Sequence, residues 1–165
     1  MEFMIVERPA RKLVSYRVVG PYEKTIKEGF RHLMAWSQRH HQKHLEWLTL
    51  FHDNPNTTPG EKLRADPSVC VADNFILDDA EGLALQTLPG GTYAAYHTTV
   101  ADGNFAKAWT EFYTHYIAES GYQPDGKACY EHYLNDGSEN GVWDVVFYQH
   151  VEKISALADP LSSAG

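Results

Sequence analysis

The hydrophobic positions in the first half of the chain follow two different spacings. Residues 13–19 (Leu-Val-Ser-Tyr-Arg-Val-Val) are rich in β-branched side chains and roughly alternate, which predicts a strand. Gly20 and Pro21 then end the strand and favour the start of a helix. Beyond them the apolar residues fall on one face of that helix, namely Ile26, Phe30, Leu33 and Met34.

Two more strands are expected before the middle of the chain. Residues 45–52 and 69–72 are largely apolar runs of strand length. Between them, residues 53–60 (Asp-Asn-Pro-Asn-Thr-Thr-Pro-Gly) form a dense run of turn-forming residues. The first half is therefore predicted to fold in the order β-α-β-β.

The same order recurs in the second half. Residues 92–98 are typical of a strand, and Gly121 is expected to end the helix that follows. Two further strands, 129–134 and 143–151, are joined by a hairpin-like segment at 135–141. The predicted helix places aromatic residues on one face, namely Phe105, Trp109, Phe112, Tyr113 and Tyr116.

The two halves align with each other at an offset of roughly 80 residues. This offset matches Pro9 with Pro89, Leu13 with Tyr93 and Tyr16 with Tyr96. We therefore expect an α+β fold of tandem pseudo-two-fold β-α-β-β repeats, with two sheets, two helices and a cleft at the seam.

One domain is expected to hold both repeats. The predicted domain spans residues 1–154, with the repeats at about 3–78 and 82–154. The last segment, 155–165, is small and polar enough to predict a flexible tail.

Composition narrows the range of partners. The formal net charge is −8, because 14 Lys and Arg residues are scattered among 22 Asp and Glu residues. Nucleic-acid binding needs clustered basic residues, so direct binding to DNA or RNA is not expected. A protein partner or a small molecule fits this charge better.

No apolar run approaches the roughly 20 residues that a membrane-spanning helix needs. Residues 1–5 lack the basic and apolar regions of a signal peptide, so no membrane association and a cytoplasmic location are expected. The two cysteines, Cys70 and Cys129, each lie in an apolar run and are interpreted as reduced core thiols, although one disulfide between them is the alternative.

Short motifs along nearly the whole chain resemble the bacterial DNA gyrase inhibitory protein family, part of the wider GyrI-like group. In the first half they are Gly-Pro-Tyr-Glu-Lys-Thr at 20–25, Leu-Met-Ala-Trp at 33–36 and Glu-Lys-Leu-Arg at 61–64. In the second half they are Gly-Gly-Thr-Tyr at 90–93, Phe-Ala-Lys-Ala-Trp at 105–109 and Glu-His-Tyr-Leu-Asn at 131–135.

The resemblance implies a fold shared with the effector-binding domains of AraC- and MerR-type multidrug regulators. It also implies inhibition of DNA gyrase, which makes gyrase the expected protein partner, and protection against gyrase-directed or DNA-damaging toxins. A further implication is an aromatic-lined pocket for small, often cationic or aromatic molecules. No cofactor is implied.

Glu131 is the leading candidate ligand-binding residue. Strand alternation puts Glu131 on the same face as Cys129 and Tyr133. A buried carboxylate without a partner costs several kcal/mol, so it pairs, takes up a proton or awaits a cationic ligand. In the multidrug-regulator relatives a pocket glutamate receives the positive charge of the drug, and Glu131 matches that motif position. The alternative is a glutamate on the solvent face of the sheet.

Aromatic side chains are the expected walls of this pocket, because their faces attract cations. The candidates are Trp36, Trp109, Tyr133, Trp143 and Tyr148. The alternative is that these rings pack the core, as aromatic stripes at helical spacing usually do. Tyr133, Trp143 and Tyr148 lie on the final two strands, which favours them as pocket residues.

A histidine-rich stretch raises the question of a metal site. His40 and His44 are four residues apart, but no carboxylate or cysteine completes a known metal-ligand spacing. A solvated linker is therefore favoured, and no metal is predicted.

Two functions from different classes remain open. The first is a binding protein that inhibits gyrase and takes up small molecules. The second, also implied by the resemblance, is a hydrolase of cyclopropane-bearing genotoxins, with Glu131 as the general base and Tyr133 assisting.

Overall fold

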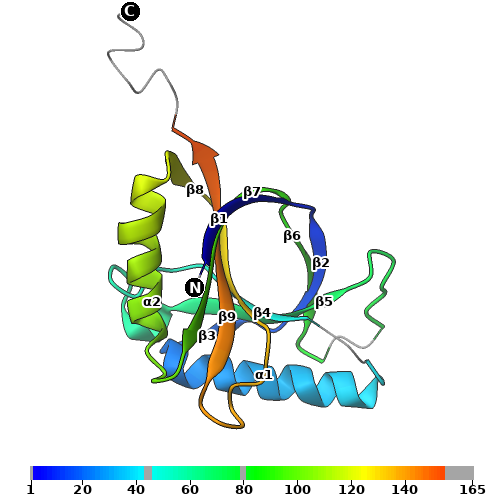
Figure 1. Cartoon of the computed structure of the whole chain (residues 1–165). Coiled ribbons are helices and arrows are strands. Elements are labelled where there is room, and N and C mark those ends of the chain that lie inside the picture. The colour runs from blue at the N-terminus through cyan, green and yellow to red at the C-terminus, as the bar shows by residue number, and fades with distance from the viewer. Residues whose placement is uncertain (1, 43–45, 79–80, 155–165) are drawn as a thin grey trace, which may run out of the picture.

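The computed structural model describes residues 2–42, 46–78 and 81–154 (Figure 1). The first half contains β1 (Glu2–Arg8), β2 (Arg11–Ser15), β3 (Val18–Val19), α1 (Tyr22–Arg39), β4 (Trp47–Phe51), the 3₁₀ turn η1 (Gly60–Lys62) and β5 (Arg64–Val71). The second half contains β6 (Ala84–Leu88), β7 (Gly91–Val100), α2 (Phe105–Glu111), the π turn η2 (Phe112–Tyr116), the 3₁₀ turn η3 (Ile117–Glu119), β8 (Tyr122–Tyr133) and β9 (Trp143–Lys153). The predicted tail at 155–165 lies outside the described residues.

Within the described residues, nine strands join into one antiparallel sheet in the order β1-β7-β9-β8-β4-β5-β2-β6, with β3 paired to β5. This order is symmetric about the β8–β4 pair: β8 corresponds to β4, β9 to β5, β7 to β2 and β1 to β6. The α+β fold class is confirmed. The halves share one sheet instead of having one each, because β8 pairs with β4 across the seam.

The outermost strands are exchanged between the halves. β1 pairs with β7 of the second half, and β6 pairs with β2 of the first half. The two crossing segments touch, because a Cβ added to Gly90 would lie only 2.6 Å from the backbone nitrogen of Ala10. Gly90 is therefore required by the close approach of two backbones.

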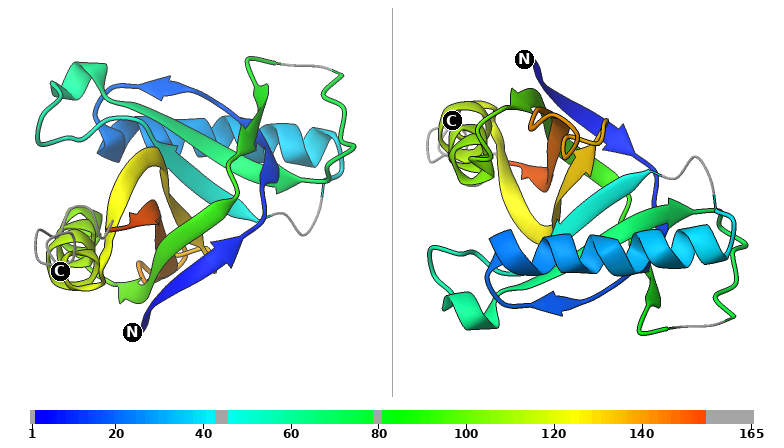
Figure 2. Two further views of the ribbon diagram at one scale, coloured as in Figure 1. Left: turned by 90° about the horizontal axis from the view of Figure 1, so that it is seen from above. Right: turned by 90° about the horizontal axis from the view of Figure 1, so that it is seen from below.

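The sheet curls so that its strands outline a ring, and both helices lie outside it (Figures 1 and 2). The inner face is filled by one cluster of buried side chains that includes Leu13, Leu48, Tyr93 and Tyr130. On the outer face, α1 packs over β5, and the segment 105–117 packs over β7 and β9. Each helix thus covers the part of the shared sheet that its own half contributes.

Several element boundaries differ from the predictions. β1 was not predicted, because residues 2–8 do not alternate cleanly and their partner strand is remote in sequence. The strand expected at 13–19 is divided into β2 and β3, and the one expected at 129–134 begins at Tyr122. The second helix is α-helical only to Glu111 and continues as a π turn.

Candidate functional site

Glu131 lies near the end of β8, on the strand pair that joins the two halves. Its register partner across the seam is Thr49 on β4. The side chain points to the outer, helix-covered face of the sheet, where it meets Trp109 of α2. The site is therefore built by both halves of the chain.

Neutral donors surround the Glu131 carboxylate. The indole Nε1–H of Trp109 donates to Oε2 over 2.7 Å, and the hydroxyl of Tyr133 donates to Oε1, also over 2.7 Å. The Thr49 hydroxyl lies 2.8 Å from the Tyr133 oxygen and completes a chain of hydroxyls that leads to the carboxylate. Only 5% of Glu131 is exposed.

The electrostatics of this carboxylate are unusual for a glutamate. Burial raises the pKa of Glu131 to about 7, and the hydrogen bonds from Tyr133 and Trp109 offset only part of that effect. Among the residues that the structure describes, Glu131 forms no salt bridge. At neutral pH the site thus holds a partly ionised carboxylate without a counter-ion.

Aromatic rings from both halves close the site. The ring of Tyr133 lies 5.7 Å from that of Phe30 on α1 and 5.3 Å from that of Trp143 on β9. The indole of Trp109 lies 5.8 Å from the ring of Phe51 on β4. These rings are partly exposed, so the seam between the helices presents an aromatic surface directly above a buried acid.

Four of the six candidate ligand-binding residues are thus neighbours in the structure: Glu131, Tyr133, Trp109 and Trp143. Trp36 lies elsewhere, in the cluster that packs α1 onto its sheet, next to Leu33 and Phe75. Cys129 shares the outer face with Glu131, as the alternation along β8 predicted, and its sulfur lies 3.7 Å from the carbonyl oxygen of Phe51.

Tyr148 lies on the opposite face of the sheet. It is paired in register with Tyr130, whereas Glu131 is paired with Phe147. Its ring stacks on that of Tyr130 with centroids 4.7 Å apart, and its hydroxyl accepts a hydrogen bond from Arg8 over 2.8 Å. The register of β8 against β9 therefore places the side chains of Tyr148 and Glu131 on opposite faces of the sheet.

Three residues of the site were not among the sequence-based candidates for it, namely Thr49, Phe30 and Phe51. All three come from the first half, and their proximity to Glu131 depends on the pairing of β4 with β8. The sequence-based candidate list drew mostly on the second half because that pairing was unknown.

The described part of the chain contains no cluster of three or more His, Cys, Asp or Glu residues able to hold a metal ion. His44 of the histidine-rich stretch lies outside the described residues. Both cysteines are free thiols, Cys70 on the inner face and Cys129 on the outer face. No helix in the described ranges is long and apolar enough to cross a membrane.

Comparison with known proteins adds family relationships to this geometry. Residues 1–147 match the family model of the GyrI-like small molecule binding domain. Relatives named DNA gyrase inhibitor, from Yersinia enterocolitica and Serratia proteamaculans, are each 46% identical over 93% of this chain and 99% of their own length.

Solved structures with low sequence identity share the fold. The EcmrR C-terminal domain superposes with a TM-score of 0.69 at 15% identity, covering 92% of this chain and 98% of that one. A hydrolase from Listeria innocua gives 0.66 at 10% identity, with 92% of each chain covered. The structure of SAV2435 bound to tetraphenylphosphonium gives 0.56 at 14% identity, covering 92% of this chain and 94% of that one.

Proposed function

The chain belongs to the GyrI-like family of small-molecule-binding domains, and on this premise we propose that it inhibits DNA gyrase and binds a small lipophilic cation at Glu131. The gyrase part is supported by identity along nearly the full length of relatives that carry the inhibitor name. Inhibition acts through a protein contact, since the net charge of −8 disfavours binding to DNA. The proposed role is protection against gyrase-directed or DNA-damaging toxins in the cytoplasm.

The proposal of a bound cation is supported mainly by the burial of the Glu131 carboxylate and by the uncharged donors around it. This carboxylate is buried among aromatic rings and, within residues 2–42, 46–78 and 81–154, receives hydrogen bonds only from the uncharged donors Trp109 and Tyr133. A cation that enters between the rings gains a charge partner and aromatic faces at once. A lipophilic cation suits this site because its own desolvation cost is small.

The structure of SAV2435, which shares this fold, supports a lipophilic cation as the ligand because it is bound to tetraphenylphosphonium. We use that ion as the probe. Titration monitored by tryptophan fluorescence is expected to show saturable binding, since Trp109 must move or lose its bond to Glu131.

Glu131→Gln is expected to weaken tetraphenylphosphonium binding by roughly a hundredfold, because the counter-charge is removed. The amide keeps the fold, as it accepts from Trp109 and donates to Tyr133. Glu152→Gln, an exposed position on β9, is the matched control and should bind as the wild type does. Equal affinity of the Glu131 and Glu152 variants would refute the cation site.

Affinity should also follow the ionisation of Glu131. With its pKa near 7, affinity for the permanently charged probe is expected to rise about tenfold from pH 6 to pH 8. A flat profile in the wild type would mean that another group receives the cation.

Gyrase inhibition is tested separately, with a supercoiling assay on gyrase from the same organism. Saturable inhibition near stoichiometric protein is expected, and Glu131→Gln should retain it because a side chain that is 5% exposed offers little surface to a protein partner. Absence of inhibition at large excess would refute the gyrase part and leave the ligand part standing.

One observation favours a second function, hydrolysis of cyclopropane-bearing genotoxins. A pKa near 7 is the range in which a carboxylate acts as general base at neutral pH, with Tyr133 beside it. Glu131 would take a proton from water as the oxygen attacks a ring carbon, and the cleaved carbon would receive a proton. Mass spectrometry of a cyclopropane substrate after incubation would reveal gain of one water molecule, absent with Glu131→Gln.

A further inference from the structure

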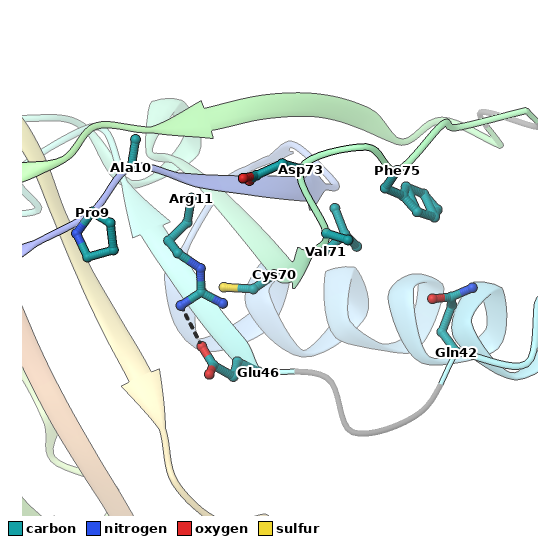
Figure 3. A pocket seen from close by; sticks show the side chains of 10 residues that line it. Pro9, Ala10, Arg11, Gln42, Glu46, Cys70, Val71, Asp73 and Phe75 are labelled. Carbon is teal, nitrogen blue, oxygen red and sulfur yellow. Dashed lines mark ion pairs between the residues drawn. The ribbon is translucent and has the colours of Figure 1, made fainter.

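A hollow lies away from Glu131, beside the crossing of the exchanged strands (Figure 3). Its volume is about 630 Å³, and its lining includes Pro9, Arg11, Gln42, Glu46, Cys70 and Phe75. Cys70 belongs to the inner-face cluster of the sheet, together with Tyr130. Tyr130 precedes Glu131 on β8 and faces the other way, so the two sites are separated by the sheet itself.

One ion pair dominates the polar side of this hollow. Arg11 Nη1 lies 3.0 Å from the carboxylate of Glu46, and both side chains are partly exposed. Figure 3 shows the guanidinium and the carboxylate facing each other, with the sulfur of Cys70 close by. Asp73 adds a second carboxylate to the lining.

Charges of both signs surround the pair, because Arg11 lines the hollow together with Glu46 and Asp73. Burial would lower the pKa of Arg11, but nearby Cys70 and Glu46 outweigh burial and the pKa is raised. Burial lowers the pKa of His132, the charge of Glu46 opposes that shift, and Arg8 and Arg11 add to it. The guanidinium groups of Arg8 and Arg11 thus both act on His132, on a protein whose net charge is strongly negative.

A buried donor lies behind the same wall. The hydroxyl of Tyr130 is fully buried and has no hydrogen-bond partner among the described residues. Tyr130 lies close enough to Arg11 to contribute to the raised pKa of Arg11. Cys70 likewise contributes to the raised pKa of Tyr130, after the larger effect of burial. An unpaired buried hydroxyl is costly, but Tyr130 does not line the hollow, so Arg11 is the polar group available to a ligand there.

We propose that this hollow is a second ligand site, and that it takes a small organic anion with an apolar body, which Arg11 binds in place of Glu46. A carboxylate or sulfonate matches the fork of N–H donors on a guanidinium. Pro9, Val71 and Phe75 supply the apolar wall. Glu46 acts as an internal competitor that holds Arg11 while the site is empty.

Cys70 provides a reporter in the lining of the hollow. The Cys129→Ser background leaves Cys70 as the single thiol of the chain. Its thiolate attacks the disulfide of dithiobis(nitrobenzoate), an aromatic carboxylate; a mixed disulfide forms, the thionitrobenzoate half leaves, and the thiol proton goes to the buffer. Dithiodipyridine undergoes the same reaction without the carboxylates.

The measured quantity is the ratio of the two rate constants, anionic reagent over neutral reagent. Arg11 and Glu46 also shift the pKa of Cys70, but this affects both reagents and cancels in the ratio. Arg11→Gln is expected to lower the ratio roughly tenfold, and Glu46→Gln to raise it several-fold, because the competitor is gone. Arg31→Gln, an exposed position on α1, is the matched control and should leave it unchanged.

Unchanged unfolding midpoints establish that the variants fold. Saturation of the wild-type rate with the anionic reagent, together with opposite changes in the two variants, supports the proposal. Equal ratios in all variants, or a lower ratio with Glu46→Gln, would overturn it.

Discussion

Two buried carboxylates in this molecule have opposite surroundings. Asp66 on β5 is 2% exposed and Glu131 on β8 is 5% exposed. Asp66 receives two hydrogen bonds from Arg17, one from His52 over 2.7 Å and one from Gln86 over 2.9 Å. Glu131 receives its hydrogen bonds from an indole and a phenol.

The pKa values diverge accordingly. Burial would raise the pKa of Asp66, but hydrogen bonds from His52, Arg17 and Gln86 outweigh it and hold the pKa well below the usual range. Burial dominates at Glu131 and raises its pKa. The structural carboxylate Asp66 has its own cation, whereas Glu131 has none among the described residues, which is the property a cation site needs.

The largest effect is expected for Asp66→Asn. This substitution leaves the charge of Arg17 without its partner and replaces one acceptor oxygen by an NH2 donor that faces other donors, so the unfolding free energy should fall by about 3 kcal/mol. Urea denaturation at pH 7 measures it. The exposed Asp78→Asn is the control and should change stability little. A loss at Asp66 as small as that of the control would mean that the network is not stabilising.

The pH dependence of stability should differ in sign between the two sites. The folded pKa of Glu131 lies above its unfolded value, so the folded state binds the extra proton and unfolding free energy falls as pH rises from about 4.5 to 7, by roughly 3 kcal/mol. Glu131→Gln should abolish this decline and be more stable than the wild type at pH 8.

Asp66 acts in the acid range instead. Its folded pKa is depressed, so its contribution is present above pH 4 and is lost as pH falls below that value. Denaturation of both single variants across pH 3 to 8 separates the two contributions. If Glu131→Gln keeps the wild-type slope between pH 5 and 7, the slope arises elsewhere.

The smallest effect is expected for Trp109→Phe, which removes one of the two donors to Glu131. The ionised carboxylate loses a charge-assisted hydrogen bond, so the pKa of Glu131 should rise by about one unit. The midpoint of the pH profile for tetraphenylphosphonium binding reports it. Trp143→Phe is the matched control, because Trp143 touches Tyr133 without bonding to the carboxylate. A shift of equal size in both variants would indicate a general loosening of the pocket.

Local pattern predicted most of the secondary structure. Gly20 and Pro21 mark the start of α1, which begins at Tyr22, and the alternation along β8 placed Glu131 and Tyr133 on one face. Local pattern failed where a strand depends on a remote partner. β1 is specified by its pairing with β7 some ninety residues later, as in Met4 with Ala95.

The sequence by itself determined the fold class and predicted Glu131 as the central acid, because both depend on periodicity and on short motifs. Tertiary structure decided which side chains meet that acid. The pairing of β4 with β8 sets Thr49 opposite Glu131, and the hairpin register turns Tyr148 to the other face. Burial and the choice of neutral donors at Glu131, against charged ones at Asp66, arise only when distant strands come together, since a pKa depends on surroundings and not on the residue alone.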